Sequence, residues 1–172
     1  MPAAKKSAGS KTKKSGETND AIALLTADHK EVKQLFKQYD KLVESEADDE
    51  EKRELAEQIC AMVTVHAMIE EEIFYPAARE GIEEQDLLDE AEVEHASAKD
   101  LIAQIEEMEP SEELYDAKVK VLGEYIDHHV KEEEGEMFPA AKKAKLDLEA
   151  LGEELLARKQ ELMAELGIDE EA

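Results

Sequence analysis

The chain has 172 residues, 46 of them acidic and 21 basic, and its formal net charge is −25. This charge argues against a nucleic-acid-binding body, because phosphate contacts need a basic surface, and against docking on anionic lipid. The length fits one domain with a sizeable core. Abundant Ala, Leu, Glu and Lys, with only 7 Gly and 4 Pro, indicate an all-α fold.

The cysteine count and the lack of long apolar runs bear on the compartment. The single Cys60 excludes an internal disulfide and agrees with a reducing compartment. No run of about 18 apolar residues is present, so no membrane span is expected, and the N-terminus lacks the apolar core of a signal peptide. By elimination, these features predict a cytoplasmic protein.

Residues 1–18 differ in composition from the rest of the chain. They are rich in Lys, Ser, Ala and Gly, with five lysines and the single acidic residue Glu17. A segment with nothing to bury is expected to be a disordered basic tail. We interpret it as a solubilising tail, rather than one that binds nucleic acid or folds back on the acidic body.

Four helices are expected between residues 19 and 145, each with an apolar seam in steps of three and four residues. The first begins at N-cap candidates in 18–20, the second follows the acidic stretch 44–51, the third follows Gly81, and the fourth starts at Pro110-Ser111. Pro76 and Pro139 are expected to kink or end their helices. The seams comprise Ile22, Leu25, Val32, Phe36, Tyr39 and Val43; Leu55, Ile59, Met62, Ile69 and Ile73; Leu88, Ala91, Ala98, Ile102 and Ile105; and Leu122 and Tyr125.

A further amphipathic stripe lies in residues 146–172: Leu148, Leu151, Leu155, Leu162 and Leu166. It predicts a C-terminal helix that packs on the bundle, with a dimer contact or another protein partner as the alternative. The fold prediction is therefore an antiparallel up-down-up-down four-helix bundle over residues 19–145, with an extra C-terminal helix.

Two segments repeat the same pattern of chemically active residues. His66–Pro76 and His129–Pro139 each place a Glu four residues after the His, at Glu70 and Glu133, and an aromatic residue just before the Pro. Residues at i and i+4 share one face of a helix, so each pair directs an imidazole and a carboxylate to one point. That is the pairing that a metal site on a helix needs.

A second repeat supplies two more histidines. Asp28-His29 and Glu94-His95 each precede an apolar pair by the same distance, so His29, His66, His95 and His129 fall in the seams of four successive helices. This order indicates a helical hairpin used twice to form two halves of one site. Buried imidazoles and carboxylates without a cation would cost several kcal/mol for each unpaired charge, which favours a bound metal.

The donor count indicates two ions rather than one. Four His and two Glu exceed the needs of a tetrahedral ion; His29 and His66 would hold one metal, His95 and His129 the other, with both carboxylates bridging. Donors without thiolate favour iron over manganese or zinc. Open positions at each ion would admit O₂, peroxide or NO.

His128 and His129 both lie near the seam of the fourth helix. Only His129 repeats the offsets of His66 to its Glu and its Pro, so His129 is the predicted ligand. His128, about 100° round the helix, should face water or a neighbouring helix. In the alternative register, His128 would pair with Glu132.

The paired His-x-x-x-Glu-Glu segments ending in Phe-Pro or Tyr-Pro, preceded by Asp28-His29 and Glu94-His95, resemble the hemerythrin-type HHE cation-binding domain over about residues 20–143. The resemblance implies a non-haem, carboxylate-bridged di-iron centre in a four-helix bundle. The ligands it implies are His29, His66, Glu70, His95, His129 and Glu133.

This chain departs from the oxygen-carrying hemerythrins at two places. Lys99 stands where those proteins have a second His, and Glu133 lies four residues after His129 where they have an Asp five residues on. With Lys33 and Lys99 equivalent, the two halves look symmetric. We therefore expect a centre that senses O₂, peroxide or NO, that scavenges them by consuming peroxide or NO, or that handles iron. An iron- or oxygen-responsive interaction module without turnover is the alternative.

Overall fold

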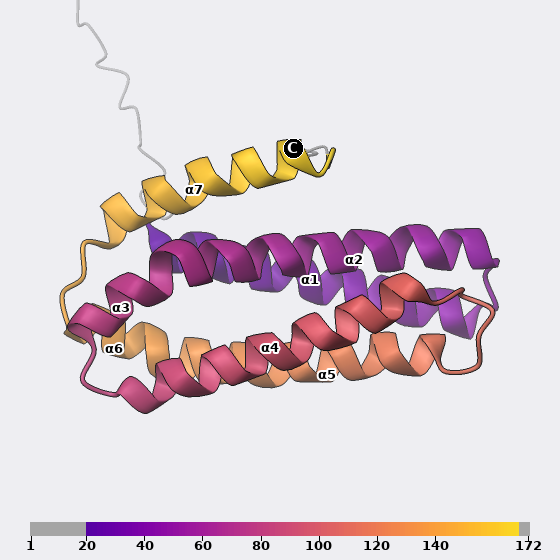
Figure 1. The fold of residues 1–172 in the computed structure, drawn as a ribbon, viewed down its shortest axis with the longest axis horizontal. Helices are drawn as coiled ribbons and strands as arrows, with labels where there is room; N and C mark the ends of the chain where they lie inside the picture. The colour runs from indigo at the N-terminus through magenta and orange to yellow at the C-terminus, as the bar shows by residue number, and fades with distance from the viewer. Residues whose placement is uncertain (1–19, 169–172) are drawn as a thin grey trace, which may run out of the picture.

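The computed structural model describes residues 20–168, and every regular element within them is helical. Four long helices form the bundle: α1 (Ala21–Glu44), α2 (Asp49–Ile69), α4 (Gln85–Glu107) and α5 (Tyr115–Glu132) (Figure 1). Helix α7 (Leu148–Glu165) follows. The predicted four-helix bundle with an extra C-terminal helix is confirmed, whereas the predicted tail, residues 1–18, lies outside the described residues.

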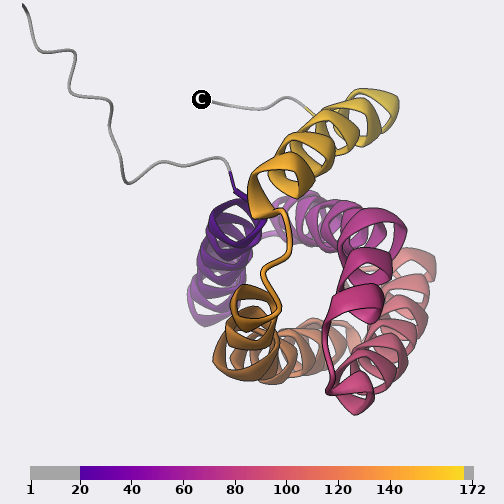
Figure 2. The ribbon, with the colours of Figure 1, turned by 90° about the vertical axis from the view of Figure 1, so that its left-hand side faces the viewer.

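Seen along their axes, the four long helices surround a common centre, and α7 lies outside them (Figure 2). Helix α7 contacts α1 and α2, on the side of the bundle opposite α4 and α5. Its Leu155 and Leu162 are buried, while Leu166, predicted to extend the stripe, lies beyond the helix end and is exposed. Within residues 20–168, no helix is long and apolar enough to cross a membrane.

The predicted seams form most of the core. Leu25, Ile59, Leu88 and Leu122, one from each long helix, are almost fully buried. Helix α1 begins at the expected place because the Asp20 side chain accepts a hydrogen bond from the Ala23 N–H at 2.8 Å. Two seam assignments were wrong, because Val43 and Tyr125 are exposed. Val43 lies one residue before the end of α1.

The fourth helix starts later than Pro110-Ser111, at Tyr115. Residues 109–114 form turns instead, in which Glu112 accepts the Glu109 N–H at 2.6 Å through its side chain. This local bond gives the backbone an alternative to the first helical turn.

Both repeats pass through a π-helical turn where a kink or an end was predicted. The turns are η1 (Glu70–Phe74) and η2 (Glu133–Met137), and they lead into α3 (Tyr75–Gly81) and α6 (Phe138–Lys143). Tyr75 N–H donates to the Glu70 carbonyl, five residues back. A proline in a helix interior meets the carbonyl four residues before it. The wider turn precedes Pro76 and Pro139 in both repeats, and the helices continue.

Candidate metal centre

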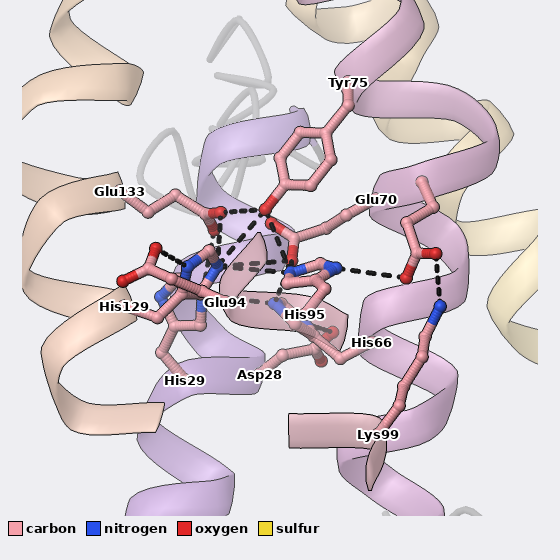
Figure 3. Close-up of polar contacts among 11 residues, drawn as sticks. Asp28, His29, His66, Glu70, Tyr75, Glu94, His95, Lys99, His129 and Glu133 are labelled. Carbon is pink, nitrogen blue, oxygen red and sulfur yellow. Dashed lines mark hydrogen bonds and ion pairs between the residues drawn. The ribbon is translucent and has the colours of Figure 1, made fainter. Parts of the chain in front are cut away.

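The six residues predicted as ligands meet at the centre of the bundle (Figure 3). Each of the four long helices contributes one histidine, and each π turn begins with one of the two glutamates. The set is His29 from α1, His66 from α2, His95 from α4, His129 from α5, Glu70 from η1 and Glu133 from η2. Both glutamates are essentially inaccessible to solvent.

One group of donors, which we call the α1/α2 cluster, consists of His29, His66, Glu70 and Glu133. The Nε2 atoms of His29 and His66 are 3.2 Å apart. His66 Nε2 is 3.2 Å from Glu70 Oε1, and His29 Nε2 is 3.2 Å from Glu133 Oε1. All four side chains offer atoms within 4.8 Å of one another, a spacing that one cation can bridge.

The second group, the α4/α5 cluster, consists of His95, His129 and Glu70. The Nε2 atoms of His95 and His129 are 3.3 Å apart. Glu70 Oε1 lies 3.3 Å from His95 Nε2. Glu133 reaches this cluster too, with Oε2 3.0 Å from His129 Nε2. Both carboxylates therefore lie between the two histidine pairs.

Three histidines are oriented by carboxylates at their other ring nitrogen. Asp28 Oδ2 lies 3.0 Å from His66 Nδ1, and Glu94 Oε1 lies 2.9 Å from His129 Nδ1. Asp28 and Glu94, each of which directly precedes a histidine in the sequence, thus hold a histidine of the following long helix. The only sequence signal for this role was that Asp28-His29 recurs as Glu94-His95. Such bonds fix which ring nitrogen faces the centre.

Glu71 holds the third of these imidazoles, that of His95. Its Oε2 lies 3.1 Å from His95 Nδ1, and Lys99 Nζ contacts its other oxygen. Lys99 therefore acts through Glu71, whereas the equivalent Lys33 is exposed on α1. Sequence reasoning missed this contact, because it joins the two halves of the repeat.

Tyr75 is a functional candidate that sequence reasoning did not single out. Its hydroxyl donates to Glu133 Oε2 at 2.6 Å and lies 3.1 Å and 3.2 Å from the Nε2 atoms of His95 and His129. At the matching place in the second repeat, Phe138 instead stacks on His29, with ring centroids 6.0 Å apart. The two clusters are thus not symmetric, contrary to expectation. In the sequence, the sign of this asymmetry was that Tyr75 precedes Pro76 whereas Phe138 precedes Pro139.

The charges of the site are strongly coupled. Burial alone lowers the pKa of His129, but Glu133 and Glu70 raise it from 6.5 to about 10. Burial has the same effect on the pKa of His66, and Glu70 and Asp28 raise it well above 6.5. Burial would raise the pKa of Glu133. Its side-chain hydrogen bonds to Glu70, His129 and His29 instead hold this pKa well below 4.5. These carboxylates stabilise positive charge at the centre of the bundle.

The donor set fits a cation for a further reason. Three buried carboxylate oxygens at the centre lack a hydrogen bond of good geometry: both oxygens of Glu70 and Oε1 of Glu133. Buried carboxylate oxygens left in this way cost free energy unless something positive binds them. Imidazole nitrogens and carboxylate oxygens are the ligands that iron, manganese and zinc accept.

A small cavity reaches the site from between the long helices. Its volume is about 30 Å³, and its walls include His66, His95 and His129 together with apolar side chains such as Val63 and Ile102. A cavity needs roughly 10–15 Å³ to hold one water molecule. This one therefore has room for a molecule of two or three atoms beside the imidazoles.

His128 lies on the surface, as the repeat predicted. Its side chain is 67% exposed, and its Nε2 is 3.2 Å from Glu132 and 3.6 Å from Glu94. His129, by contrast, is buried at the centre. The alternative register is therefore not the one adopted.

A bundle with two facing sets of buried His and Glu donors is a helical metal-binding domain. Comparison with known families agrees: residues 20–141 match the hemerythrin HHE cation binding domain. The chain belongs to this family. A crystal structure of a hemerythrin HHE cation binding domain-containing protein from Mycobacterium kansasii is similar, with a TM-score of 0.71 and 26% identity, over 85% of this chain and 88% of that one.

A DNA nickase from Nostoc sp. is also similar. It is 31% identical over 117 residues, which are 68% of this chain. The matched part is only 32% of the nickase, so this chain spans about a third of that protein's length.

Proposed function

We propose that the α1/α2 and α4/α5 clusters hold two iron ions, bridged by Glu70 and Glu133, and that the centre binds O₂ or a related small molecule. The observation that carries the proposal is the pair of buried carboxylates lying between two pairs of imidazoles. Iron held by such donors supplies one-electron chemistry and a place for O₂, peroxide or NO to attach.

The protein groups have separate tasks in this proposal. His29 and His66 bind at one position and His95 and His129 at the other. The Tyr75 hydroxyl, within 3.2 Å of both Nε2 atoms of the α4/α5 cluster, is an additional donor for that position only. The α1/α2 position, faced by Phe138 instead, is the one with fewer protein donors.

The cavity supports a small ligand. Its size admits O₂, NO or peroxide, and its largely apolar wall favours the two diatomic gases, because a polar molecule loses hydrogen bonds to water on entering it. Scavenging or sensing of such a ligand suits this arrangement better than transport of a larger substrate. We propose that the body makes no nucleic-acid contact, since the net charge is −25. We also propose a cytoplasmic setting, because the single Cys60 agrees with a reducing compartment.

The alternative is an interaction module without turnover, in which iron occupancy orders the bundle and a protein partner responds. The specific observation in its favour is that α7, outside the bundle, contacts residues beside the site. Consumption of hydrogen peroxide or NO by the iron-loaded protein would establish an enzyme; stable ligand binding without consumption would favour the module.

The direct test is to load the full chain with Fe²⁺ without oxygen, remove excess metal, and measure metal content and the ultraviolet-visible spectrum with and without O₂, NO or azide. We expect about two irons per chain, because the donors exceed the needs of one ion. We also expect a Tyr75→Phe variant to keep both irons but lose visible iron-phenolate absorption in the oxidised state. A chain that takes up one zinc ion and no iron contradicts the proposal.

A further inference from the structure

Helix α7 places a lysine beside the metal centre from far along the chain. Lys159 Nζ lies 2.7 Å from Asp28 Oδ1, the oxygen that does not hold His66. The other oxygen, Oδ2, is 3.0 Å from His66 Nδ1 (Figure 3). Lys159, Asp28 and His66 thus form a continuous chain of contacts from α7 through α1 to α2.

This ion pair is well shielded from water. The side chains of Lys159 and Asp28 are 14% and 5% exposed. Removing two charges from water costs several kcal/mol for each, and apolar residues of similar size often serve stability as well or better. Stability alone is therefore a weak reason for a lysine at this place. Its contact with the carboxylate that orients His66 is a more specific one.

The residue before it makes a parallel contact. Arg158 Nε is 2.7 Å from Glu72 Oε2, and Nη2 is 3.3 Å from Oε1, a bidentate pair. Glu72 lies in η1, two residues after Glu70. Consecutive residues of α7 therefore hold the α1 side and the η1 side of the α1/α2 cluster.

The other two oriented histidines have no equivalent contact with α7. The lysine beside Glu71 is Lys99, which lies on α4, the same helix as His95. Glu94, which holds His129, is 3.6 Å from the exposed His128 of α5. In the described part of the chain, Lys159 is thus the cation that reaches an orienting carboxylate from outside the bundle. It also lies beyond residues 20–141, which match the family.

We propose that α7 positions the α1/α2 cluster, with Lys159 acting through Asp28 on His66 as the principal contact and Arg158 acting through Glu72 as the lesser one. Arg158 ranks second because its pair with Glu72 is more exposed, and exposed ion pairs contribute little. The inference rests on the proposed metal function and adds a positioning element to it: binding at one of two positions depends on a helix outside the domain that forms the site.

A double-mutant cycle on the full chain tests the proposal, with Co²⁺ as the probe because its visible spectrum reports each binding step. Lys159→Met should weaken one of the two stepwise Co²⁺ affinities about 10- to 100-fold, the usual effect of losing an orienting contact, and leave the other unchanged. Asp28→Asn should weaken the same step. The double variant Lys159→Met/Asp28→Asn should be no weaker than the weaker single variant, because both act on one contact.

Three further measurements separate positioning from general damage. Lys159→Arg should restore most of the affinity by keeping the charge, and Lys120→Met, which removes an exposed lysine of α5, should change neither step. Thermal unfolding of each metal-free variant shows whether it folds. Unchanged stepwise affinities in folded Lys159→Met, or additive losses in the double variant, would overturn the positioning role alone. A wild-type chain that takes up no Co²⁺ and no Fe²⁺ would overturn the proposed function as well.

Discussion

At the scale of single residues, the site depends on which atom of each side chain faces the centre. The histidines present Nε2 to the two carboxylates, and three of them are fixed through Nδ1 by Asp28, Glu71 and Glu94. One-residue differences matter here, because adjacent helical positions point about 100° apart.

The neighbouring histidines of α5 give a direct test of that geometry. His129→Ala should reduce iron from about two ions per chain to about one, because one position loses an imidazole that the structure places at the centre. His128→Ala should keep both ions, since His128 is on the surface. Iron content and the spectrum of each purified variant are the measurements; loss of iron from the His128 variant would contradict this arrangement.

The raised pKa of His129 predicts how stability depends on pH without metal. A group with a pKa of about 10 when folded and 6.5 when unfolded adds stability that is complete below pH 6.5 and disappears as pH rises towards 10. Its contribution should fall by up to about 1.4 kcal/mol per pH unit in that window. Urea unfolding of the chelated protein at several pH values measures this.

His128→Gln serves as the matched control for the pH dependence and should keep the slope, whereas His129→Gln should flatten it. The same coupling means that metal must displace protons from His66 and His129. Metal loss on acidification should therefore begin above pH 6.5. Tight binding that does not change between pH 8 and pH 6 would contradict this.

At the scale of elements, the two π turns place the carboxylates. Each begins at its glutamate, and each precedes the aromatic residue and proline of its repeat. π turns are rare in proteins as a whole, but those that occur are often found at functional sites. Here they let the helix pass its proline while Tyr75 and Phe138 still face the histidines.

Gly135 within η2 gives a prediction about this element. A methyl group at Gly135 would meet nothing within 4 Å, and its backbone has no positive φ. Gly135→Ala should therefore stabilise the protein by about 0.5–1 kcal/mol, because alanine loses less conformational entropy on folding. Gly123→Ala is the contrast: its methyl group would approach Phe36 to 3.0 Å, so it should gain less or lose stability. Chemical unfolding compares the two variants.

At the scale of the whole molecule, the bundle carries the site and α7 closes one side of it. Residues 20–141 match the family, and α7 covers α1 and α2 beyond that match. The body keeps its strong negative charge, while five lysines gather in residues 1–18, which are outside the described residues.

Deletion of residues 1–18 should leave helicity, iron content and the unfolding temperature nearly unchanged. That segment is poor in apolar side chains other than alanine, so it contributes little to a core. Circular dichroism, metal analysis and a thermal scan of the shortened chain check this. A large fall in iron content would show that the segment takes part in metal binding.

The sequence by itself determined the fold class, most of each seam and the six residues that meet at the centre. It could do so because helical periodicity and the internal repeat are local signals: His66 with Glu70 and His129 with Glu133 are one turn apart on one helix face. The same repeat distinguished His129 from His128.

Only the tertiary structure decided which partners complete the site. Asp28 turns to His66 and Glu71 to His95, both across helices, and Lys159 reaches Asp28 across 131 positions. The repeat suggested two equal halves, but packing brings the Tyr75 hydroxyl to one cluster and the Phe138 ring to the other. No local periodicity encodes these contacts, because they depend on how separate helices face one another once the core has formed.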